Sequence, residues 1–384
     1  MENKTIFYTG VAALIFFEIA NVYFIMPMPG SQEMTSLAWA YFFYQWRWAF
    51  RGAAALMMAL GLAAAYRHSR WITLGALALA YTITGIFNFY MAADHMFYQP
   101  DKLIMANSAA NKIGLEKLVI GVERNGIAKA YPIQLIGYHH QVRDTLGKDP
   151  VMITYCTVCR TGRVYQPLVL GKPEVFRLVG MDHFNAMLED VSTGSWWRQA
   201  TGEAVAGPLT GEQLPELGYS QTSLAQWLTL YPNSLVMQPD STFSEEYAHM
   251  DSYDFGIDRG ELTRTDTLSW KDKSWVVGVD IFGVSKAFDW NLLKKERIIN
   301  DAVRATPILI VMAADSKSFF AFERPDGPSV FSVKNDSLCC SDKTWNLKGV
   351  AADPAVLPLK KITAYQEFWH SWKAFHPHTL VSKD

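Results

Sequence analysis

Cysteine is scarce in this chain, and several common catalytic signatures are missing from it. Only four cysteines occur among 384 residues, so a small fold built on many disulfides is excluded. The 35 Lys and Arg residues do not outnumber the 37 Asp and Glu residues, and the net charge of −2 predicts no nucleic-acid partner. The sequence has no P-loop, no Rossmann glycine fingerprint, no Ser-His-Asp triad order and no Cys-x-x-Cys-His haem motif. The enzyme classes that these motifs mark are therefore not indicated.

Three long apolar runs lie near the N-terminus. They cover Ile6–Met28, Leu37–Tyr66 and Trp71–Met91, and each is long enough to cross a bilayer as a helix. Soluble folds seldom contain three such runs in succession, and the first run is too long for a cleaved signal peptide. We therefore predict that residues 1–92 form a membrane anchor with three transmembrane helices, and that a lipid bilayer is one partner of the protein.

Charge at the ends of these runs predicts the orientation. The short loop Arg67–Arg70 is strongly basic, and Lys4 precedes the first run. Because basic loops stay in the cytoplasm, we expect a multi-pass protein of a bacterial inner membrane with its soluble body in the periplasm. Inside the spans, a structural ion pair between Glu18 and Arg51 is favoured over a functional site, and Arg47 is expected to reach toward the outer interface.

The sequence after the anchor contains an internal repeat. Val119–Val122 and Val276–Val279 start two similar stretches, and matching residues continue without a gap at a constant offset of 157 positions. The segments that end the two stretches, Trp227–Val236 and Trp372–Val381, are also alike. This period is far longer than that of solenoid repeats. The pattern predicts a soluble body made of two duplicated lobes.

Local patterns then predict the fold class. We assign residues 93–240 to the first repeat unit and residues 241–384 to the second. Valine-rich runs followed by a glycine turn are typical of strands in a hairpin. Leu224–Leu230 and Ile362–Phe375 are predicted helices, each stopped by a proline. The predicted fold is α+β with strands dominant.

Two cysteines separated by two residues, Cys156 and Cys159, follow the strand-like run Pro150–Tyr155. A Thr-Gly pair comes soon after them and breaks the helix that a thioredoxin-type redox pair requires. A strand, a Cys-x-x-Cys turn and a second strand are typical of a metal knuckle. A disulfide or redox pair and two inert buried thiols are the alternatives. At the repeat offset the second unit has alanine and serine instead, so the site is expected in the first unit.

A tetrahedral site for a soft metal needs about four ligands. We predict that Cys156, Cys159 and His140 bind zinc, copper or iron, with His183 or a water as the fourth ligand. His140 is expected on a neighbouring strand, where the adjacent His139 would point the other way. The alternative for both His140 and His183 is a histidine that is hydrogen-bonded within the protein body.

A polar and aromatic stretch forms a second candidate site. Asp190, Trp196, Trp197 and Arg198 lie within residues 190–199, which begin as a turn rich in side-chain oxygens. We predict that these four residues line a cleft for a small molecule or a periplasmic protein. Asp190 is also a candidate to orient a metal-bound imidazole. The alternative is a turn with aromatic packing.

Several motifs follow one another in a fixed order along the body. They are Lys129-Ala130-Tyr131-Pro132, His140, Asp144, Tyr155-Cys156-Thr157-Val158-Cys159, Asp190, Thr193-Gly194-Ser195-Trp196-Trp197-Arg198-Gln199 and Gly207-Pro208-Leu209-Thr210-Gly211. In this order they resemble a bacterial family known as domain of unknown function 3179, from about Pro100 to Val381. The family usually has Cys-Pro-Leu-Cys-Gly and His-Glu where this chain has Cys-Thr-Val-Cys-Arg and His-Gln. The resemblance implies no settled activity.

These observations support hypotheses of different classes. The first is a membrane-anchored periplasmic metal-binding protein, active in redox chemistry or metal handling. The alternative is a non-catalytic periplasmic module that binds a ligand or a partner and uses its cysteines structurally. A third hypothesis, a thiol–disulfide oxidoreductase, requires an exposed Cys156 followed by a helix. The sequence does not decide whether the protein is an enzyme.

Overall fold

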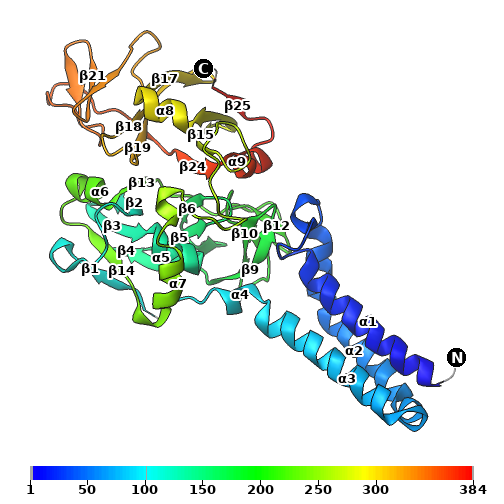
Figure 1. The fold of residues 1–384 in the computed structure, drawn as a ribbon. Helices are drawn as coiled ribbons and strands as arrows, with labels where there is room; N and C mark the ends of the chain where they lie inside the picture. Colours follow the sequence, from blue (N-terminus) through cyan, green and yellow to red (C-terminus); the bar gives the residue numbers. More distant parts are fainter. Residues whose placement is uncertain (1–2, 101, 383–384) are drawn as a thin grey trace. The chain divides into compact units, whose positions relative to one another are not determined.

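The computed structural model describes residues 3–100 and 102–382 of the 384-residue chain. Three long helices come first. They are α1 (Asn3–Tyr23), α2 (Leu37–His68) and α3 (Arg70–Gly85), and the π-helical turn η2 (Ile86–Tyr90) continues α3. The three helices lie side by side in one elongated bundle (Figure 1).

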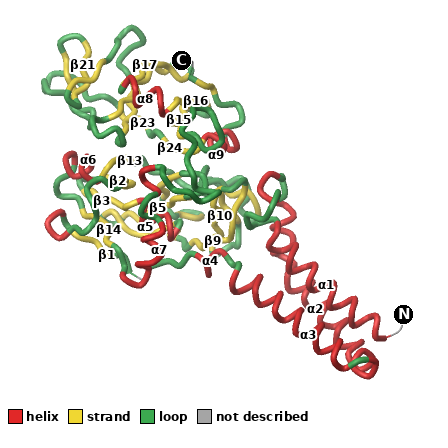
Figure 2. Tube along the Cα trace, in the orientation of Figure 1, coloured by secondary structure: helices red, strands yellow, loops and turns green. Residues whose placement is uncertain are grey.

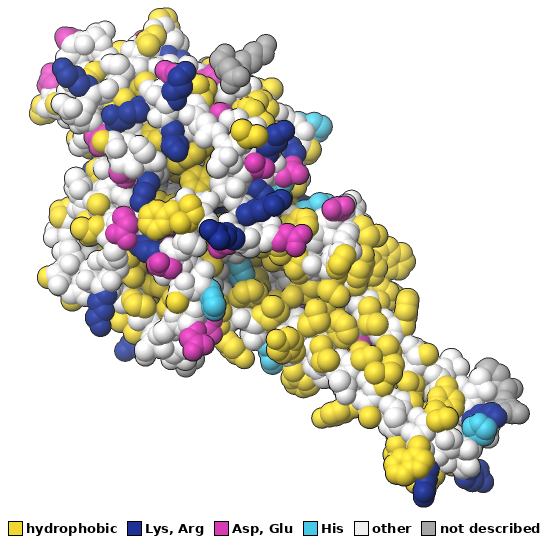
Figure 3. Space-filling view, viewed as in Figure 1, with side chains coloured by type: hydrophobic (Ala, Val, Ile, Leu, Met, Phe, Trp, Pro, Cys, Tyr) yellow, Lys and Arg dark blue, Asp and Glu magenta, His cyan; other side chains and the backbone are white. Residues whose placement is uncertain are grey.

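The helices α1 and α2, and α3 together with η2 (Arg70–Tyr90), are each long and apolar enough to cross a membrane, which confirms the three predicted segments as candidate spans. The first helix ends at Tyr23, before the end of the apolar run at Met28, because residues 24–27 form a turn. Hydrophobic side chains cover the visible face of the bundle (Figure 3). Arg67 and Arg70 lie where α2 ends and α3 begins. A helical surface of this kind suits the interior of a bilayer.

A polar cluster links the three helices inside the bundle. Arg51 donates two hydrogen bonds to the carboxylate of Glu18, from Nε to Oε1 at 2.8 Å and from Nη2 to Oε2 at 2.9 Å. Asn88 from η2 donates to the same carboxylate at 2.9 Å. The predicted ion pair is therefore confirmed, and Glu18 is 0 % exposed. Arg47 bonds the backbone oxygen of Tyr44 and lies over its ring.

Packing divides the chain into two compact units, which are described separately. Unit 1 comprises Met1–Tyr98, Glu174–Arg198 and Glu203–Gln213, and unit 2 comprises Gln99–Pro173, Gln199–Gly202 and Leu214–Asp384. The helical bundle thus belongs to the same unit as a segment from the middle of the chain.

Unit 1 adds a four-stranded antiparallel sheet and the short helix α4 (Ala93–Met96) to the bundle. The strand order is β12-β11-β10-β9, with bounds β9 (Phe176–Asp182), β10 (Asn185–Asp190), β11 (Trp196–Arg198) and β12 (Ala204–Ala206). The loop after α1 approaches β9 closely, because Met181 donates its backbone N–H to Ile25 at 2.7 Å. Gly180 permits this approach, since a Cβ there would lie 2.2 Å from the Ile25 oxygen.

The first half of unit 2 consists of two sheets around helix α5 (Ile133–His139). One sheet has the order β1-β14-β3-β2-β13, with β1 (Ile104–Ala106), β2 (Leu118–Arg124), β3 (Ile127–Pro132), β13 (Ser220–Ser223) and β14 (Leu235–Gln238). The other has the order β4-β5-β6, with β4 (Gln141–Leu146), β5 (Asp149–Cys156) and β6 (Thr161–Tyr165). The strands β7 (Leu168–Val169) and β8 (Lys172–Pro173) and the helices α6 (Leu224–Leu230) and α7 (Ser244–His249) complete this half.

The second half of unit 2 has a similar element order. Its sheets are β24-β15-β16-β25, β17-β18-β19-β23 and β20-β21-β22. The bounds are β15 (Trp275–Ile281), β16 (Val284–Asp289), α8 (Trp290–Glu296), β17 (Ile298–Val303), β18 (Thr306–Met312), β19 (Phe319–Glu323), β20 (Ser332–Lys334), β21 (Ser337–Cys340), β22 (Lys343–Trp345), β23 (Lys361–Ile362), β24 (Tyr365–Phe368), α9 (Trp369–Phe375) and β25 (Leu380–Val381). Figure 2 shows strands and loops dominating unit 2.

The fold is mixed α+β, with a helical N-terminal region followed by a β-rich body of several sheets. The strands predicted at 119–122 and 276–279 and the helix Leu224–Leu230 are confirmed. The helix predicted over Ile362–Phe375 is wrong in extent, because α9 begins at Trp369. Tyr365–Phe368 instead forms strand β24, which pairs with β15 from Gly278 to Trp275. Pairing with a strand distant in sequence overrides the local helical pattern here.

Candidate functional site

The cysteine pair lies in a tight hairpin turn within unit 2. Cys156 ends β5 and faces Thr161 at the start of β6, so strand, turn and strand follow as predicted. Arg160 closes the turn with a left-handed φ of 55°. Cys156 and Cys159 are free thiols and are each 0 % exposed. The oxidoreductase hypothesis needed an exposed Cys156 and a following helix, and neither is found.

Burial determines the chemistry of these thiols. It raises the pKa of Cys159 well above its ordinary value, and the neighbouring Cys156 raises it further. The Ser371 hydroxyl and the Lys273 ammonium act in the opposite direction but more weakly. At neutral pH the Cys159 thiol is therefore protonated, and a protonated thiol is a poor nucleophile.

A histidine from the far end of the chain faces the pair. Nε2 of His370 lies 3.9 Å from Sγ of Cys159. Nδ1 of His370 lies 3.0 Å from the backbone oxygen of Asp272. A carbonyl oxygen only accepts hydrogen bonds, so Nδ1 carries the proton and Nε2 directs its lone pair toward the thiol. Burial, together with the nearby Lys273 ammonium, lowers the pKa of His370 to about 4, so the ring is neutral.

Buried hydrogen bonds position this histidine. Arg163 on β6 bonds Glu367 on β24 at 2.5 Å, and Glu367 accepts from the Ser371 hydroxyl at 3.0 Å. Ser371 also contacts the hydroxyl of Thr161 at 3.1 Å. These four side chains fix the start of α9 against the hairpin, and α9 carries His370.

The predicted histidine ligands have other surroundings. His140 is not on a strand, because it caps α5 with a left-handed φ of 58°, and its Nδ1 lies 2.9 Å from the oxygen of Tyr155. Burial lowers the pKa of His140 to about 4. His183 belongs to unit 1, where its Nδ1 contacts Asp182 at 2.8 Å, and this hydrogen bond raises its pKa.

No group of three or more His, Cys, Asp or Glu side chains within residues 3–100 and 102–382 is arranged to hold a metal ion. The ligand set predicted from sequence, Cys156, Cys159, His140 and His183, stays a prediction, with His183 in unit 1 and the other three residues in unit 2. His140 lies in a helix cap rather than on the expected strand, so the strand geometry that was to bring it to the sulfurs does not apply.

The four residues of the second predicted site have two different roles: three stabilise the turn and sheet, and one lines a pocket. The carboxylate of Asp190 organises the turn, since it accepts from the backbone of Thr193 at 2.6 Å and from Nε1 of Trp197 at 2.9 Å. Trp197 packs edge-on against Phe176. Arg198 forms an ion pair with Asp182 at 2.7 Å. Asp190, Trp197 and Arg198 thereby stabilise the turn and sheet.

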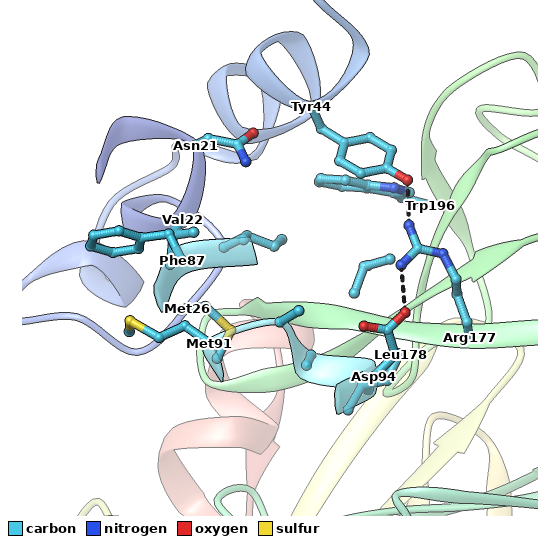
Figure 4. Close-up of a pocket in the computed structure, with 14 residues that line it drawn as sticks. Asn21, Val22, Met26, Tyr44, Phe87, Met91, Asp94, Arg177, Leu178 and Trp196 are labelled. Carbon is cyan, nitrogen blue, oxygen red and sulfur yellow. Dashed lines mark hydrogen bonds and ion pairs between the residues drawn. The ribbon is translucent and has the colours of Figure 1, made fainter. Parts of the chain in front are cut away.

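Trp196 lines a cavity of about 100 Å³ in unit 1, which we term the anchor pocket (Figure 4). The pocket lies where α1, α2 and η2 meet α4 and the strands β9 and β11. One side is apolar and the other is polar. The residues used below are Asn21, Met26, Tyr44, Phe87, Met91, Asp94, Arg177 and Trp196.

Arg177 organises the polar side of the anchor pocket. Its Nε bonds Glu189 at 2.8 Å, its Nη1 bonds Asp94 at 3.0 Å, and its Nη2 bonds the hydroxyl of Tyr44. Glu189 also accepts from Nε1 of Trp196 at 2.8 Å. These groups satisfy one another, so interactions from the five elements α2, α4, β9, β10 and β11 hold the wall rigidly.

Asn21 differs from the other polar groups of the pocket. Its Oδ1 is buried and has no hydrogen-bond partner among the described residues. Leaving a buried acceptor unsatisfied costs about 1–3 kcal/mol, so such a group in a cavity wall indicates a missing donor. Asn21 therefore leaves one buried acceptor of the pocket lining unsatisfied, and this oxygen would have to turn toward the cavity to meet a bound molecule.

Sequence reasoning missed His370 and Asn21. His370 is distant from Cys159 in sequence and obeys no ligand spacing, so no sequence signal pointed to it. Asn21 does carry a signal, because it is an amide at the end of an apolar membrane span, and polar residues in spans often mark functional sites.

Comparison with known proteins identifies a family for the part of the chain that follows the helical bundle. A family model described as a protein of unknown function, DUF3179, matches residues 100–379. This range begins after the helical bundle. No curated protein and no solved structure matches the chain.

Proposed function

The chain belongs to the DUF3179 family, whose description assigns no activity, and we propose a function from its geometry. The protein is a membrane-anchored ligand-binding protein with structural cysteines. The anchor pocket is the proposed binding site. The observation that carries this proposal is the buried, unpartnered Oδ1 of Asn21 in a cavity also lined by Trp196. We further propose that the soluble body lies in the periplasm of a bacterium, on the strength of Lys4 and the basic segment Arg67–Arg70.

The walls of the pocket define the ligand. Met26, Phe87 and Met91 offer an apolar surface, and Asn21 offers an acceptor. A cavity of about 150 Å³ holds benzene, so the anchor pocket of about 100 Å³ accommodates a group slightly smaller than one ring. The expected ligand is a small amphipathic molecule that presents a hydroxyl or amine to Asn21 and carries no net charge.

The state of the cysteines supports a structural role. Both thiols are fully buried, and the Cys159 thiol is protonated at neutral pH. A buried free cysteine behaves as a small apolar side chain. In this proposal Cys156 and Cys159 fill the interior of the hairpin and help to seat α9.

The test measures binding of two matched probes to full-length protein in detergent. 1-Propanol carries a donor, and n-butane, which has nearly the same size, does not. We expect saturable quenching of Trp196 fluorescence by 1-propanol. Binding of 1-propanol to Asn21→Leu should be at least about 10-fold weaker, since one hydrogen bond is worth about 1.4 kcal/mol, and binding of n-butane should not change. Trp196→Phe removes the signal and serves as the control. Equal binding of 1-propanol to wild type and Asn21→Leu would reject the site.

A metal-binding function is the second candidate, and the contact between Cys159 and His370 favours it. Neutral imidazole with its Nδ1–H on a backbone carbonyl is the usual arrangement of a metal-bound histidine. Metal binding requires Cys156 to turn toward the same point, because the described residues hold no ready-made group of three ligands. Elemental analysis of protein purified without chelators tests it, with His370→Ala compared to His140→Ala as matched histidine variants.

We also propose that the two halves of unit 2 are copies of one ancestral unit, corresponding to the repeat units 93–240 and 241–384. The elements β2, β3, α5 and β4 have the same lengths as β15, β16, α8 and β17, and each pair of bounds differs by 157 positions. The strand β14 pairs in parallel with β3, and β25 pairs in parallel with β16. Identical bounds in four successive elements support common descent.

Side-chain details support the same proposal. The left-handed residue after the helix is His140 in the first copy and Arg297 in the second, with φ of 58° and 61°. A lysine on the second strand of each hairpin pairs with an aspartate, Lys129 with Asp144 and Lys286 with Asp301. These pairs recur at the offset of 157 positions that the sequence shows.

A further inference from the structure

A second cavity lies wholly within unit 2 and is separate from the anchor pocket. It measures about 190 Å³ and is lined by Glu123, Ser220, Trp227, Tyr231, Lys361 and Thr363. Ser220 starts β13, where it pairs with Gly121, and Lys361 starts β23, where it pairs with Phe322. The two residues therefore come from strands of different sheets, and regular pairing fixes the backbone of each.

The side chains of these two residues meet in the cavity. Nζ of Lys361 donates a hydrogen bond to Oγ of Ser220. Ser220 is only 6 % exposed, and Lys361 is exposed as a whole residue although its amine is withdrawn from solvent. Desolvation of the amine lowers the pKa of Lys361 to about 8, and the Glu123 carboxylate opposes this shift. A measurable fraction of the amine is neutral near pH 8.

We propose that Ser220 is a nucleophile activated by Lys361, and that this cavity transfers acyl groups from small neutral esters to water. A serine hydroxyl is a weak nucleophile by itself and needs an adjacent base within hydrogen-bond reach. Serine paired with lysine is one of the known forms of this arrangement. The proposal concerns an activity beyond ligand binding in the anchor pocket and does not depend on that site.

The reaction proceeds in two balanced steps. The neutral amine of Lys361 takes the proton of the Ser220 hydroxyl while Oγ bonds to the acyl carbon. The ester C–O bond then breaks, and the leaving alcohol takes the proton from the Lys361 ammonium. In the second step a water gives its proton to Lys361 and attacks the acyl carbon. Cleavage of the acyl–Oγ bond returns the proton to Ser220 and releases the carboxylic acid.

The lining of the cavity selects the acyl group. The rings of Trp227 and Tyr231 lie against each other at a tilt of 35°, with centroids 4.3 Å apart, and provide an apolar wall. A volume of about 190 Å³ suits a short acyl chain of a few carbons. Glu123 is exposed at the same cavity and disfavours acidic substrates by charge repulsion. A short neutral ester is therefore the expected substrate class.

Two measurements on full-length protein in detergent test the proposal. The first is hydrolysis of p-nitrophenyl butyrate. The second is covalent labelling by a fluorophosphonate, with the modified residue mapped by mass spectrometry. We expect label on Ser220, no turnover above buffer for Ser220→Ala, and a fall of about 100-fold or more for Lys361→Met, in line with loss of a general base.

Matched variants distinguish activation of Ser220 by Lys361 from the effect of removing any lysine or serine. Lys360→Met removes the neighbouring lysine, which pairs with Glu323 at the surface, and Ser332→Ala removes an exposed serine. Both are expected to keep wild-type rates. Lys361→Arg retains the positive charge but not the base, so it should also lose activity. Labelling of wild-type protein elsewhere than Ser220, or equal labelling of Lys361→Arg and wild type, would overturn the proposal.

Discussion

Nε2 of His370 lies 3.9 Å from Sγ of Cys159, and the two residues come from α9 and from the hairpin of β5 and β6. The contact joins segments of the first and second halves of unit 2 that are 211 residues apart. Hydrogen bonds from Arg163 and Ser371 to Glu367 surround it. The two residues that suggest metal chemistry therefore lie among the contacts that link the two halves of the unit.

Thiol reactivity should separate the cysteines into two classes. Cys156 and Cys159 are 0 % exposed, whereas Cys339 and Cys340 are partly exposed. In native protein we expect N-ethylmaleimide to modify Cys339 and Cys340 first and to leave the buried pair unmodified until the protein unfolds. Mass spectrometry of a labelling time course gives the answer. Rapid modification of Cys159 would show that the hairpin opens in solution.

The intramembrane ion pair should contribute strongly to stability. Arg51→Leu leaves the Glu18 carboxylate without its bidentate partner, and removing one member of a buried pair costs about 3–5 kcal/mol. We expect a clear fall in the thermal unfolding midpoint in detergent. The double variant Glu18→Leu, Arg51→Leu should recover much of that loss, because no charge remains buried. A double variant no better than the single one would contradict this account.

Asp254 should make stability depend on pH. Burial raises its pKa to about 6 from the ordinary 3.8, so the folded state prefers the protonated form. The resulting stability is fully present below about pH 4 and is lost as pH rises through about 6, an effect of about 3 kcal/mol. Asp254→Asn should remove this dependence, since asparagine still accepts from the backbone of Leu118.

The measurement is the difference in unfolding free energy between Asp254→Asn and wild type from pH 4 to 7. The difference is needed because the pKa values of His140 and His370 are lowered to about 4. These two histidines therefore destabilise the folded state as pH falls, whereas Asp254 destabilises it as pH rises. The variant should gain on wild type as pH rises. A difference that stays constant over this range would contradict the buried-acid account.

Two glycines should respond alike to substitution. A Cβ at Gly121 would lie 2.3 Å from the Trp227 ring, and a Cβ at Gly278 would lie 2.1 Å from the Trp372 ring. Alanine at either position is expected to destabilise the protein by about 1–3 kcal/mol through overpacking. Gly327→Ala is the control, since no described atom lies within 4 Å of its Cβ position. Chemical denaturation compares the three variants, and a neutral Gly121→Ala would argue against equivalent packing in the two halves.

Orientation in the membrane is tested by fusion reporters. Lys4 and the segment Arg67–Arg70 predict that the soluble body is outside the cytoplasm. A reporter active only in the periplasm, fused after Asp384, should be active, and the same reporter inserted within the basic segment should be silent. The reverse pattern would place the body in the cytoplasm.

Much of the local structure could be predicted from the sequence. The Thr-Gly pair after Cys159 correctly excluded a helix, and the proline after Tyr231 correctly ended α6. The pair of Glu18 and Arg51 was predictable because a bilayer leaves an isolated charge no other partner. The helix ends depend on residues next to them in sequence, and the ion pair depends on the bilayer, which offers a buried charge no other partner.

The remaining features depend on contacts between distant segments. Tyr365–Phe368 has helical neighbours in sequence but becomes a strand because β15 offers an unpaired edge. His140 was expected on a strand, and a left-handed helix cap places it elsewhere. His370 and Asn21 gain their importance from partners brought near by folding. Periodicity and spacing do not encode such contacts.

The contact between Cys159 and His370 also has a consequence for synthesis of the chain. His370 follows Cys159 by 211 residues, so this contact cannot form until all of the intervening chain has been made. Closure of so long a loop is slow compared with formation of hairpins and helices. Until α9 docks, the hairpin that carries Cys156 and Cys159 lacks the cover of His370 and Ser371, and a chain cut before Trp369 would lack it permanently.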